Sequence, residues 1–222
     1  MGKKVILTGS TGMVGHGVLL ECLDSEAVST IILLNRNSVG IKHPKIYEIL
    51  IDDIRQVEKV ESSLTGIDAC FYCMGVSAVG LSEEKYHDLT YNIAANIFTS
   101  LYKLNPDMVS IYVSGQGTDS SESGSSMWAR VKGKTENMVF NLGGEKAYAF
   151  RPGMIIPERD VKSKTSWYNT LYVIMRPLFP LFKLSKRVTT TVKLGKAMIN
   201  ILIKQPPKKI LTNPDINRLA TD

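Results

Sequence analysis

The chain has 222 residues, of which 44% are hydrophobic and 22% are charged, and its formal net charge at pH 7 is +6. This length and balance are typical of a soluble globular protein that forms one domain, residues 1–222, with a sizeable buried core. Three cysteines, an odd number, exclude a fully paired disulfide framework, and no apolar leader precedes the first strand, so we expect a cytoplasmic protein.

The first predicted elements are a strand, a glycine-rich turn and a helix. The apolar run 4–8 predicts a strand, and apolar residues at helical spacing follow over 13–24. Between them stand three glycines at intervals of three residues. Such a turn directs backbone N–H groups and a helix N-terminus at a pyrophosphate, so it predicts a dinucleotide site. The expected cofactor contacts here are Gly9, Ser10, Thr11, Gly12, Met13 and Val14, and we expect Gly15 to let the helix pack on the strand.

Strands and helices alternate along the rest of the chain. Strands are expected at 30–35, 45–51, 68–73, 108–113, 146–150 and 208–211. Helices are expected at 56–64, 82–104, 127–142 and 192–203. Repeated βα units of this length predict the α/β class, with a Rossmann-type doubly wound parallel sheet and helices on both of its faces.

The end of the second strand indicates which dinucleotide binds. A site for NAD usually places an acidic residue there to bind the ribose 2′-hydroxyl, and this strand ends in Asn35 and Arg36 without a carboxylate. A guanidinium group suits a 2′-phosphate through paired, charge-assisted hydrogen bonds. Arg36 therefore favours NADP over NAD, and a solvated loop arginine is the alternative.

The third and fourth strands end in further candidate cofactor contacts. Asp53, which precedes Ile54, either reads the adenine amino group or only caps the following helix. Cys73, Met74 and Gly75 close the fourth strand, where the backbone borders the cofactor crevice. We expect Gly75 to let the ribose approach closely.

Two other chemistries have little support in the sequence. Cys70 and Cys73 have the spacing of a redox pair, but both lie in a predicted strand. Residues i and i+3 of a strand point to opposite faces and lie roughly 10 Å apart, beyond the reach of a disulfide bond. Three scattered histidines without clustered carboxylates give no signal for a metal site. We therefore predict neither a redox pair nor a bound metal.

Several motifs together make the chain resemble a known family. They are the glycine turn 8–15, Asp53-Ile54, the run 64–68, Ser114, the run 131–136 and the run 150–153. With them the chain resembles the atypical short-chain dehydrogenase/reductases, near the Tat-interacting oxidoreductase-like proteins and the NAD(P)-binding epimerase/dehydratase-like proteins. The resemblance covers nearly the whole length. It implies an NAD(P)-binding fold and says little about the substrate.

The resemblance also implies roles for particular residues. In this family a serine after the fifth strand orients the carbonyl group, and a tyrosine four residues before a lysine donates the proton. Ser114 and Lys132 match this pattern, which implies that they are catalytic and that Lys132 holds the nicotinamide ribose. Further cofactor contacts are implied for the run Arg151, Pro152 and Gly153.

Trp128 stands where the family has its tyrosine. An indole N–H donates hydrogen bonds but has no acid function near pH 7, so Trp128 cannot protonate an alkoxide. Three alternatives stay open. The substrate needs no protein acid, as is true of a flavin or quinone; or the protein binds NADP without catalysis; or another group supplies the proton. Candidates for that group are Tyr86, Tyr91, Tyr168, Tyr172, His87 and water.

The C-terminal part is basic and aromatic. Residues 111–222 hold 18 Lys and Arg against 8 Asp and Glu, whereas residues 1–110 hold 9 against 13. The segment after the sixth strand binds substrate in extended members of the family, which implies a small C-terminal helical substrate cap at 154–205. The apolar and basic segment 162–187 of this cap has two possible roles. It forms a lid over the crevice, which is the role we favour, or it makes a peripheral contact with an anionic membrane. Its charges and prolines argue against a membrane-spanning helix.

These observations predict an NADP(H)-dependent oxidoreductase that moves a hydride to or from a small hydrophobic or anionic substrate. The alternative is a non-catalytic NADP-sensing or partner-binding module. We expect a monomer or homodimer. No nucleic-acid partner is expected, because the basic charge comes without a recognised nucleic-acid-binding module.

Overall fold

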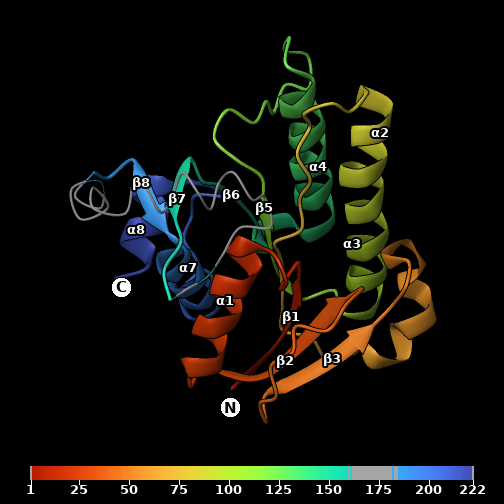
Figure 1. Ribbon diagram of the computed structural model, residues 1–222, viewed down its shortest axis with the longest axis vertical. Helices are drawn as coiled ribbons and strands as arrows, with labels where there is room; N and C mark the ends of the chain where they lie inside the picture. Colours follow the sequence, from red (N-terminus) through yellow and green to blue (C-terminus); the bar gives the residue numbers. More distant parts are fainter. Residues whose placement is uncertain (1, 160, 162–181, 183–184, 222) are drawn as a thin grey trace.

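A seven-stranded parallel sheet forms the centre of the computed structural model, which describes residues 2–159, 161, 182 and 185–221 (Figure 1). The strand order is β3-β2-β1-β4-β5-β6-β9, and every neighbouring pair is parallel. The strands are β1 (Lys3–Thr8), β2 (Val28–Asn35), β3 (Ile46–Leu50), β4 (Ala69–Tyr72), β5 (Val109–Val113), β6 (Ala147–Arg151) and β9 (Ile210–Thr212). The predicted Rossmann-type sheet is confirmed. Because the strand order reverses beside β1, this fold binds ligands outside the carboxyl ends of β1 and β4.

Helices cover both faces of this sheet (Figure 1). One face carries α1 (Met13–Asp24), α7 (Thr191–Ile203) and α8 (Asn213–Leu219). The other carries the 3₁₀ segment η1 (Ile54–Ser63), α3 (Ile93–Leu104) and α4 (Met127–Gly143). The central strands are buried on both sides: Val5 and Leu7 belong to the core under α1 and α7, whereas Ile6 belongs to the core under α3. Continuous apolar runs are what such doubly covered strands require.

The predicted helix 82–104 is a continuous helical segment with a wider turn in its middle. It consists of α2 (Glu83–His87), a π-helical turn η2 (Asp88–Asn92) and α3. Ser82 caps it as predicted, because its hydroxyl group accepts a hydrogen bond from the Lys85 N–H at 3.2 Å. A π turn differs from an α turn in that its backbone hydrogen bonds join residues five apart instead of four. The side-chain periodicity of five residues does not reveal this difference.

Two short strands and one helix escaped the sequence analysis. The strands β7 (Met154–Ile156) and β8 (Val188–Thr190) form a separate two-stranded parallel sheet. Three residues are too few to show an alternating pattern. The missed helix, α8, begins with a capping box of Thr212 and Asp215, a signal that the sequence does contain.

One asparagine of α8 ties the small sheet to the main one. The Asn213 side-chain amide donates hydrogen bonds to the carbonyl oxygens of Met154, at 3.2 Å, and Arg187, at 2.6 Å. Its side-chain oxygen accepts from the Gly153 N–H at 3.2 Å. The buried Asn213 therefore contacts the entry to β7 and the entry to β8, and Asn217 of the same helix also donates to the Val188 carbonyl oxygen of β8 at 2.8 Å.

The helix α7 packs closely on α1. A Cβ atom at Gly17 of α1 would overlap with the Thr191 side chain, and one at Gly195 of α7 would lie 2.7 Å from the Glu21 Cβ. Residues 191–203, which the sequence analysis included in the substrate cap, are thus part of the helical layer that covers the sheet. Most of the segment 162–187 lies outside the described residues, so its role as a lid or membrane contact stays a prediction.

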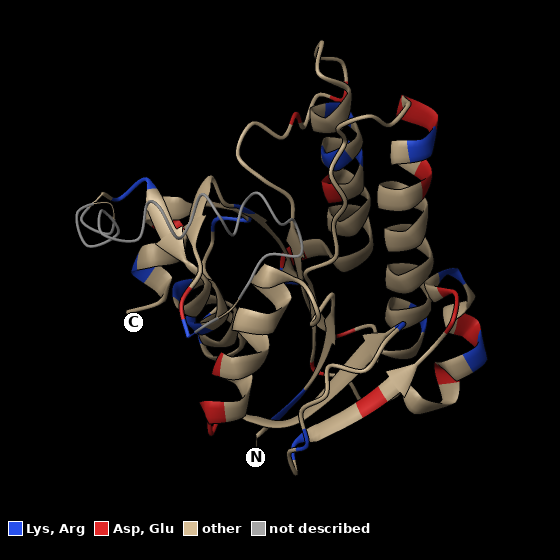
Figure 2. Cartoon of the chain, viewed as in Figure 1, with Lys and Arg blue, Asp and Glu red and all other residues tan. Residues whose placement is uncertain are grey.

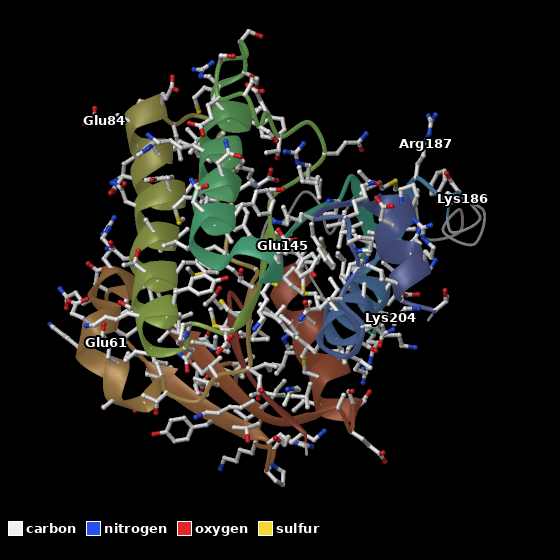
Figure 3. All side chains as sticks on the ribbon, turned by 180° about the vertical axis from the view of Figure 1, so that it is seen from behind. Glu61, Glu84, Glu145, Lys186, Arg187 and Lys204 are labelled. Carbon is white, nitrogen blue, oxygen red and sulfur yellow. The ribbon has the colours of Figure 1, made fainter. Side chains whose placement is uncertain are left out.

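Charged residues of both signs lie on both sides of the molecule. Glu61 and Glu84 lie on the side of η1 and α2, and Lys186, Arg187 and Lys204 lie on the opposite side, near β8 and α7 (Figure 3). Figure 2 also shows basic residues on η1 and α2 and acidic residues on α1. Within the described part of the chain, no helix has the length and apolar character needed to cross a bilayer.

The close packing of α1 on α7 predicts a stability effect at Gly17. In an open helix position, Gly17→Ala would stabilise the protein by about 1 kcal/mol through helix propensity. Here we expect a net loss of about 1–3 kcal/mol in the free energy of unfolding, because the new Cβ overlaps with Thr191. Urea unfolding followed by circular dichroism measures this. The control is Gly75→Ala, whose Cβ would meet no atom within 4 Å, and equal stabilities of the two variants would contradict the packing argument.

Candidate functional site

The glycine turn between β1 and α1 is shaped by backbone contacts. Gly9 has a φ of +72°, and a Cβ there would lie 2.7 Å from the Cys73 carbonyl oxygen at the end of β4. A Cβ at Gly15 would overlap with the Gly9 carbonyl group. The fold itself therefore requires glycine at both positions, as predicted for the turn and for the packing of helix on strand.

Gly12 is less closely enclosed than Gly9 and Gly15. Among the described residues, the one atom within 4 Å of its Cβ position is the Gly9 carbonyl oxygen, a close contact at 3.3 Å, and the Gly12 backbone is extended. Gly12 is the N-cap of α1, which has no side-chain cap and no acidic residue in its first turn. A helix N-terminus carries a partial positive charge, and its first amides have no partner in their own helix. The turn therefore fits the diphosphate of a dinucleotide, and Gly12 keeps the approach free.

The end of β4 also leaves space. Cys73 and Met74 are half-buried, and Gly75 is exposed with no atom within 4 Å of its Cβ position. Room for a ribose thus exists at Gly75, although the predicted contact itself stays a prediction. All three cysteines are free thiols, and burial raises the pKa of Cys73, Cys70 and Cys22.

The loop after β2 carries the candidate 2′-phosphate group. Arg36 is exposed and, among the described residues, makes no hydrogen bond or ion pair. Beside it, Asn35 is buried and accepts a hydrogen bond from the Ser10 hydroxyl group of the glycine turn at 2.9 Å. The end of β2 has no carboxylate of its own in the sequence, but the neighbouring strand β3 brings one there. The Glu48 carboxylate of β3 accepts a hydrogen bond from the Asn35 side-chain amide at 3.0 Å.

Asp53 acts as the helix cap that the sequence allowed. Its carboxylate accepts from the Arg55 N–H at 3.0 Å and lies 3.5 Å from the Arg55 guanidinium group. Ile54, the first residue of η1, is buried. An adenine contact by Asp53 or Ile54 remains a prediction.

On the other side of the sheet edge, α4 brings Trp128 and Lys132 to the loop that follows β5. The two side chains are one helical turn apart, as expected. The Trp128 ring lies against Gly117, whose Cβ position is 3.3 Å from the ring. The Lys132 ammonium group donates to the Ser114 carbonyl oxygen and lies 3.9 Å from the Cβ position of Gly115. The predicted catalytic residues are therefore neighbours.

The Ser114 side chain is directed into the protein. Its hydroxyl group is 2.5 Å from a Glu136 carboxylate oxygen and 3.1 Å from the Phe150 carbonyl oxygen. A hydroxyl group has one proton, and both of these neighbours accept hydrogen bonds. The predicted role of Ser114 as a donor to a substrate carbonyl therefore requires its hydroxyl group to turn away from Glu136.

Glu136 and Arg151 form a buried ion pair that the sequence analysis missed. Glu136 has no solvent exposure, and the Arg151 guanidinium group binds both of its carboxylate oxygens, at 3.0 Å and 2.5 Å. Arg151 also donates to the Ser120 hydroxyl group, so it ties the long loop 114–126 to β6. The predicted cofactor contacts 151–153 thus face this loop: the Pro152 carbonyl group accepts from the Gln116 N–H at 2.9 Å, and a Cβ at Gly153 would overlap with Gln116.

Burial changes the acidity of Lys132. Loss of hydration lowers its pKa to about 8, against the opposing charge of Glu136. A lysine in this range is still mostly protonated at pH 7. The site therefore keeps one cation at the position where the family holds the nicotinamide ribose.

The alternative proton sources lie elsewhere. Tyr86 is 1% exposed. His87 stacks on Tyr91 with 4.8 Å between ring centroids, and the Lys134 ammonium group lies 4.9 Å from the Tyr91 ring. Lys134 and Lys132 are two residues apart on α4 and point to nearly opposite sides of it. His87 and Tyr91 are therefore not beside Lys132, and the other two candidates, Tyr168 and Tyr172, lie outside the described residues.

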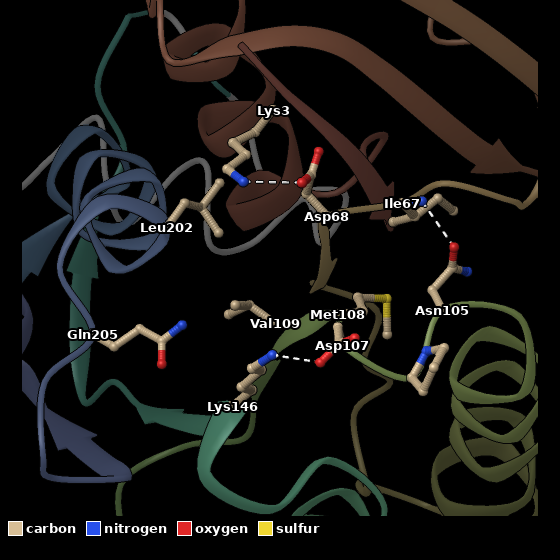
Figure 4. Close-up of a pocket in the computed structure, with 11 residues that line it drawn as sticks. Lys3, Ile67, Asp68, Asn105, Asp107, Met108, Val109, Lys146, Leu202 and Gln205 are labelled. Atoms are coloured by element: carbon tan, nitrogen blue, oxygen red, sulfur yellow. Dashed lines mark hydrogen bonds and ion pairs between the residues drawn. The ribbon is translucent and has the colours of Figure 1, made fainter. Parts of the chain in front are cut away.

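A pocket of about 390 Å³ opens at the other edge of the sheet (Figure 4). It lies at the amino ends of β1, β4, β5 and β6, and its charged groups are paired: Lys3 with Asp68 at 3.0 Å, and Lys146 with Asp107 at 2.8 Å. This is the edge away from the glycine turn. Among the described residues, no group of His, Cys, Asp and Glu has the arrangement of a metal site.

A family model described as "NAD dependent epimerase/dehydratase family" matches residues 5–125. The chain belongs to this family, within the atypical short-chain dehydrogenase/reductases. It is 29% identical over 173 residues to "Protein fmp52, mitochondrial" of Aspergillus clavatus. This alignment covers 71% of this chain and 68% of the relative. It is 24% identical over 170 residues to "Protein HTATIP2" of Rattus norvegicus, over 74% of this chain and 68% of that one.

The fold also matches a solved structure that contains a cofactor. It is the Bordetella bronchiseptica enzyme WbmF in complex with NAD+, with a TM-score of 0.68 and 12% identity. The match covers 99% of this chain and 77% of that one. This likeness shows the fold, and the family description supports a nicotinamide cofactor for this chain.

The buried ion pair predicts a large stability effect. Glu136→Gln leaves the guanidinium group of Arg151 without its counter-charge, so we expect the free energy of unfolding to fall by about 2–4 kcal/mol. Adding Arg151→Met to this variant should recover part of the lost stability. Urea unfolding of the single and double variants gives the coupling free energy between Glu136 and Arg151. Glu145→Gln, which removes an exposed partner of Lys209, is the control and should change little. Equal losses in both single Glu variants would contradict this assignment.

Proposed function

We propose that the protein binds NADP(H) across the carboxyl ends of β1 and β4 and acts as an oxidoreductase on a small hydrophobic or anionic substrate. The observation that supports this most is the α1 N-terminus that no side chain caps, preceded by Gly12, whose Cβ position meets only the Gly9 carbonyl oxygen among the described residues. An uncapped N-terminus does not serve the packing of the chain itself. Both features serve an anionic ligand that comes close to the backbone.

Each side of the site has a separate task in this proposal. The first amides of α1 bind the diphosphate, and Arg36 binds the 2′-phosphate, which distinguishes NADP from NAD. Lys132 holds the nicotinamide ribose through its ammonium group. When bound, NADP(H) supplies or accepts the hydride. Trp128 covers the site from α4 without offering a proton, which suits an acceptor that solvent protonates, such as a flavin or quinone.

A second function is a non-catalytic NADP sensor or partner-binding module. Two observations favour it: tryptophan stands at the position of the acid, and the Ser114 hydroxyl group is engaged by Glu136. The loss of NADPH absorbance over a panel of quinones, aldehydes and flavins separates the two functions. Turnover on any of them supports the enzyme. Tight NADPH binding without turnover supports the sensor.

The cellular location is a separate proposal. The cytoplasmic expectation stays, and the fungal relatives carry "mitochondrial" in their names. Fractionation of cells that produce the protein compares the two locations. Cosedimentation with vesicles that contain anionic lipid, at low salt, tests the peripheral membrane contact proposed for 162–187. Recovery of the protein only in the supernatant would remove that contact.

Cofactor binding should depend on the missing side chain at Gly12. Gly12→Val adds a side chain that the extended backbone tolerates and that requires the Gly9 carbonyl oxygen to move by a few tenths of an ångström, so we expect the fold to survive and the Kd for NADPH to rise about tenfold or more. Titration calorimetry measures the Kd, and urea unfolding checks the stability. Gly15→Ala is the counterpart, because its Cβ overlaps with Gly9 and should lower stability. If purified wild-type protein bound neither NADPH nor NADH, the proposed function would be wrong.

Cofactor affinity should also depend on pH through Lys132. Its pKa of about 8 means that the ammonium group is charged below this pH and neutral above it. Because the charged form favours an anionic ligand, we expect the affinity for NADPH to fall as pH rises from 7 to 9. Calorimetry at a series of pH values should show this fall in the wild type and not in Lys132→Met. The same pH dependence in both proteins would show that another group titrates.

A further inference from the structure

Glu48 occupies an unusual place for a carboxylate. It lies on β3 opposite Leu33 of β2, on the face of the sheet that α1 covers, and its side chain is half-buried. Partners in adjacent strands point to the same face, so Glu48 and Asn35, two residues beyond Leu33, share this face. A charged group is stable there only if hydrogen bonds replace its lost hydration.

Three donors surround this carboxylate, and all belong to the end of β2 and the loop after it. The Asn35 side-chain amide donates at 3.0 Å, the Ser38 hydroxyl group at 2.6 Å and the Val39 N–H at 2.9 Å. Burial alone would raise the pKa of Glu48, but these hydrogen bonds lower it below its usual value, so the group is ionised at neutral pH.

The same contacts determine where Arg36 stands. Asn35 precedes it and Ser38 follows two residues later, so Glu48 fixes the chain on both sides of Arg36. The Asn35 side-chain oxygen accepts from Ser10 at 2.9 Å, which links this loop to the glycine turn. Arg36 itself is exposed and has no partner among the described residues. Because its backbone is held in place, the Arg36 guanidinium group loses less conformational freedom when it binds an anion.

We propose that Glu48 is a positioning residue for cofactor choice: it holds the loop 35–39 so that Arg36 meets the 2′-phosphate of NADP. This inference rests on the proposed function and deepens it. In this arrangement, selectivity depends on a residue of β3 that touches no part of the cofactor. The carboxylate acts by occupying three donors of the loop, which leaves the Arg36 guanidinium group available for the 2′-phosphate.

The test is the ratio of the Kd values for NADP and NAD, measured by titration calorimetry. We expect Glu48→Gln to weaken NADP binding about five- to tenfold, because the loop loses a charge-assisted anchor, and to change NAD binding less than about twofold. Ser38→Ala keeps the carboxylate and removes one donor, so it should shift the ratio in the same direction by a smaller factor. Because Ser38 is exposed, we expect Ser38→Ala to fold, so it tests the inference even if Glu48→Gln does not fold.

Two controls separate positioning from charge and from general structure. Glu58→Gln removes an exposed carboxylate from η1 with the same change in net charge and should leave the ratio unchanged. In an Arg36→Ala background, Glu48→Gln should have no further effect on the ratio, because the group that it positions is absent. A merely structural role would weaken both cofactors equally in either background.

The outcomes distinguish this inference from the function on which it rests. If the wild type binds NADP and the ratio is the same in Glu48→Gln and Ser38→Ala, the inference fails and the proposed function stands. An increase in NADP affinity in Glu48→Gln would show that the carboxylate repels the 2′-phosphate, which also overturns it. If the wild type binds neither cofactor, both fail together.

Discussion

The contact between the glycine turn and the end of β4 is the constraint on which the structure depends. Backbone atoms of Gly9 lie against Cys73, and Gly15 lies against Gly9, with no side chain between them. The carboxyl ends of the two central strands and the N-terminus of α1 therefore meet at one point. Any larger residue at Gly9 or Gly15 would separate these elements, and the loop after β2 is placed by a hydrogen bond to the same turn.

The site has two halves with different physical character. On the side of β1 and β2, the uncapped N-terminus of α1 and the Arg36 guanidinium group, which has no partner among the described residues, favour an anionic ligand. Across the sheet edge, on the side of β5 and β6, a buried network of Ser114, Glu136 and Arg151 satisfies its own charges. Such a network holds the loop 114–126 against the sheet and gives the site rigidity. Two basic residues of α4 also contact this loop: Lys132 donates to the Ser114 carbonyl oxygen and Arg130 to the Gly124 carbonyl oxygen.

The sequence predicted the sheet well because its central strands, such as β1 and β4, are buried on both faces and have glycines near their ends. It also placed Lys132 on the helix that follows β5, and the Lys132 ammonium group does contact the Ser114 carbonyl oxygen; the catalytic roles of Ser114, Trp128 and Lys132 stay a prediction. It failed for Glu48 and Glu136. Glu48 binds Asn35, which is 13 residues away on β2, and Glu136 of α4 binds Arg151, which is 15 residues away on β6. No local sequence pattern indicates such pairings.

Glu48 nevertheless left a trace in the sequence, as a single acidic residue inside an apolar predicted strand. A buried charge in such a place needs donors, and the polar residues after β2 were available to supply them. The short strands β7 and β8 left no comparable trace, because their pairing depends on a contact with Asn213 from the far end of the chain.

Asn213 has a consequence for how this architecture diversifies. By binding the carbonyl groups of Met154 and Arg187, it holds the start of β7 beside the chain that leads into β8. Just beyond β7, Arg159 forms ion pairs with Glu21 and Asp24 of α1, so the scaffold has a second anchor there. Changes of sequence that keep both anchors leave the described main sheet and α1 joined as they are.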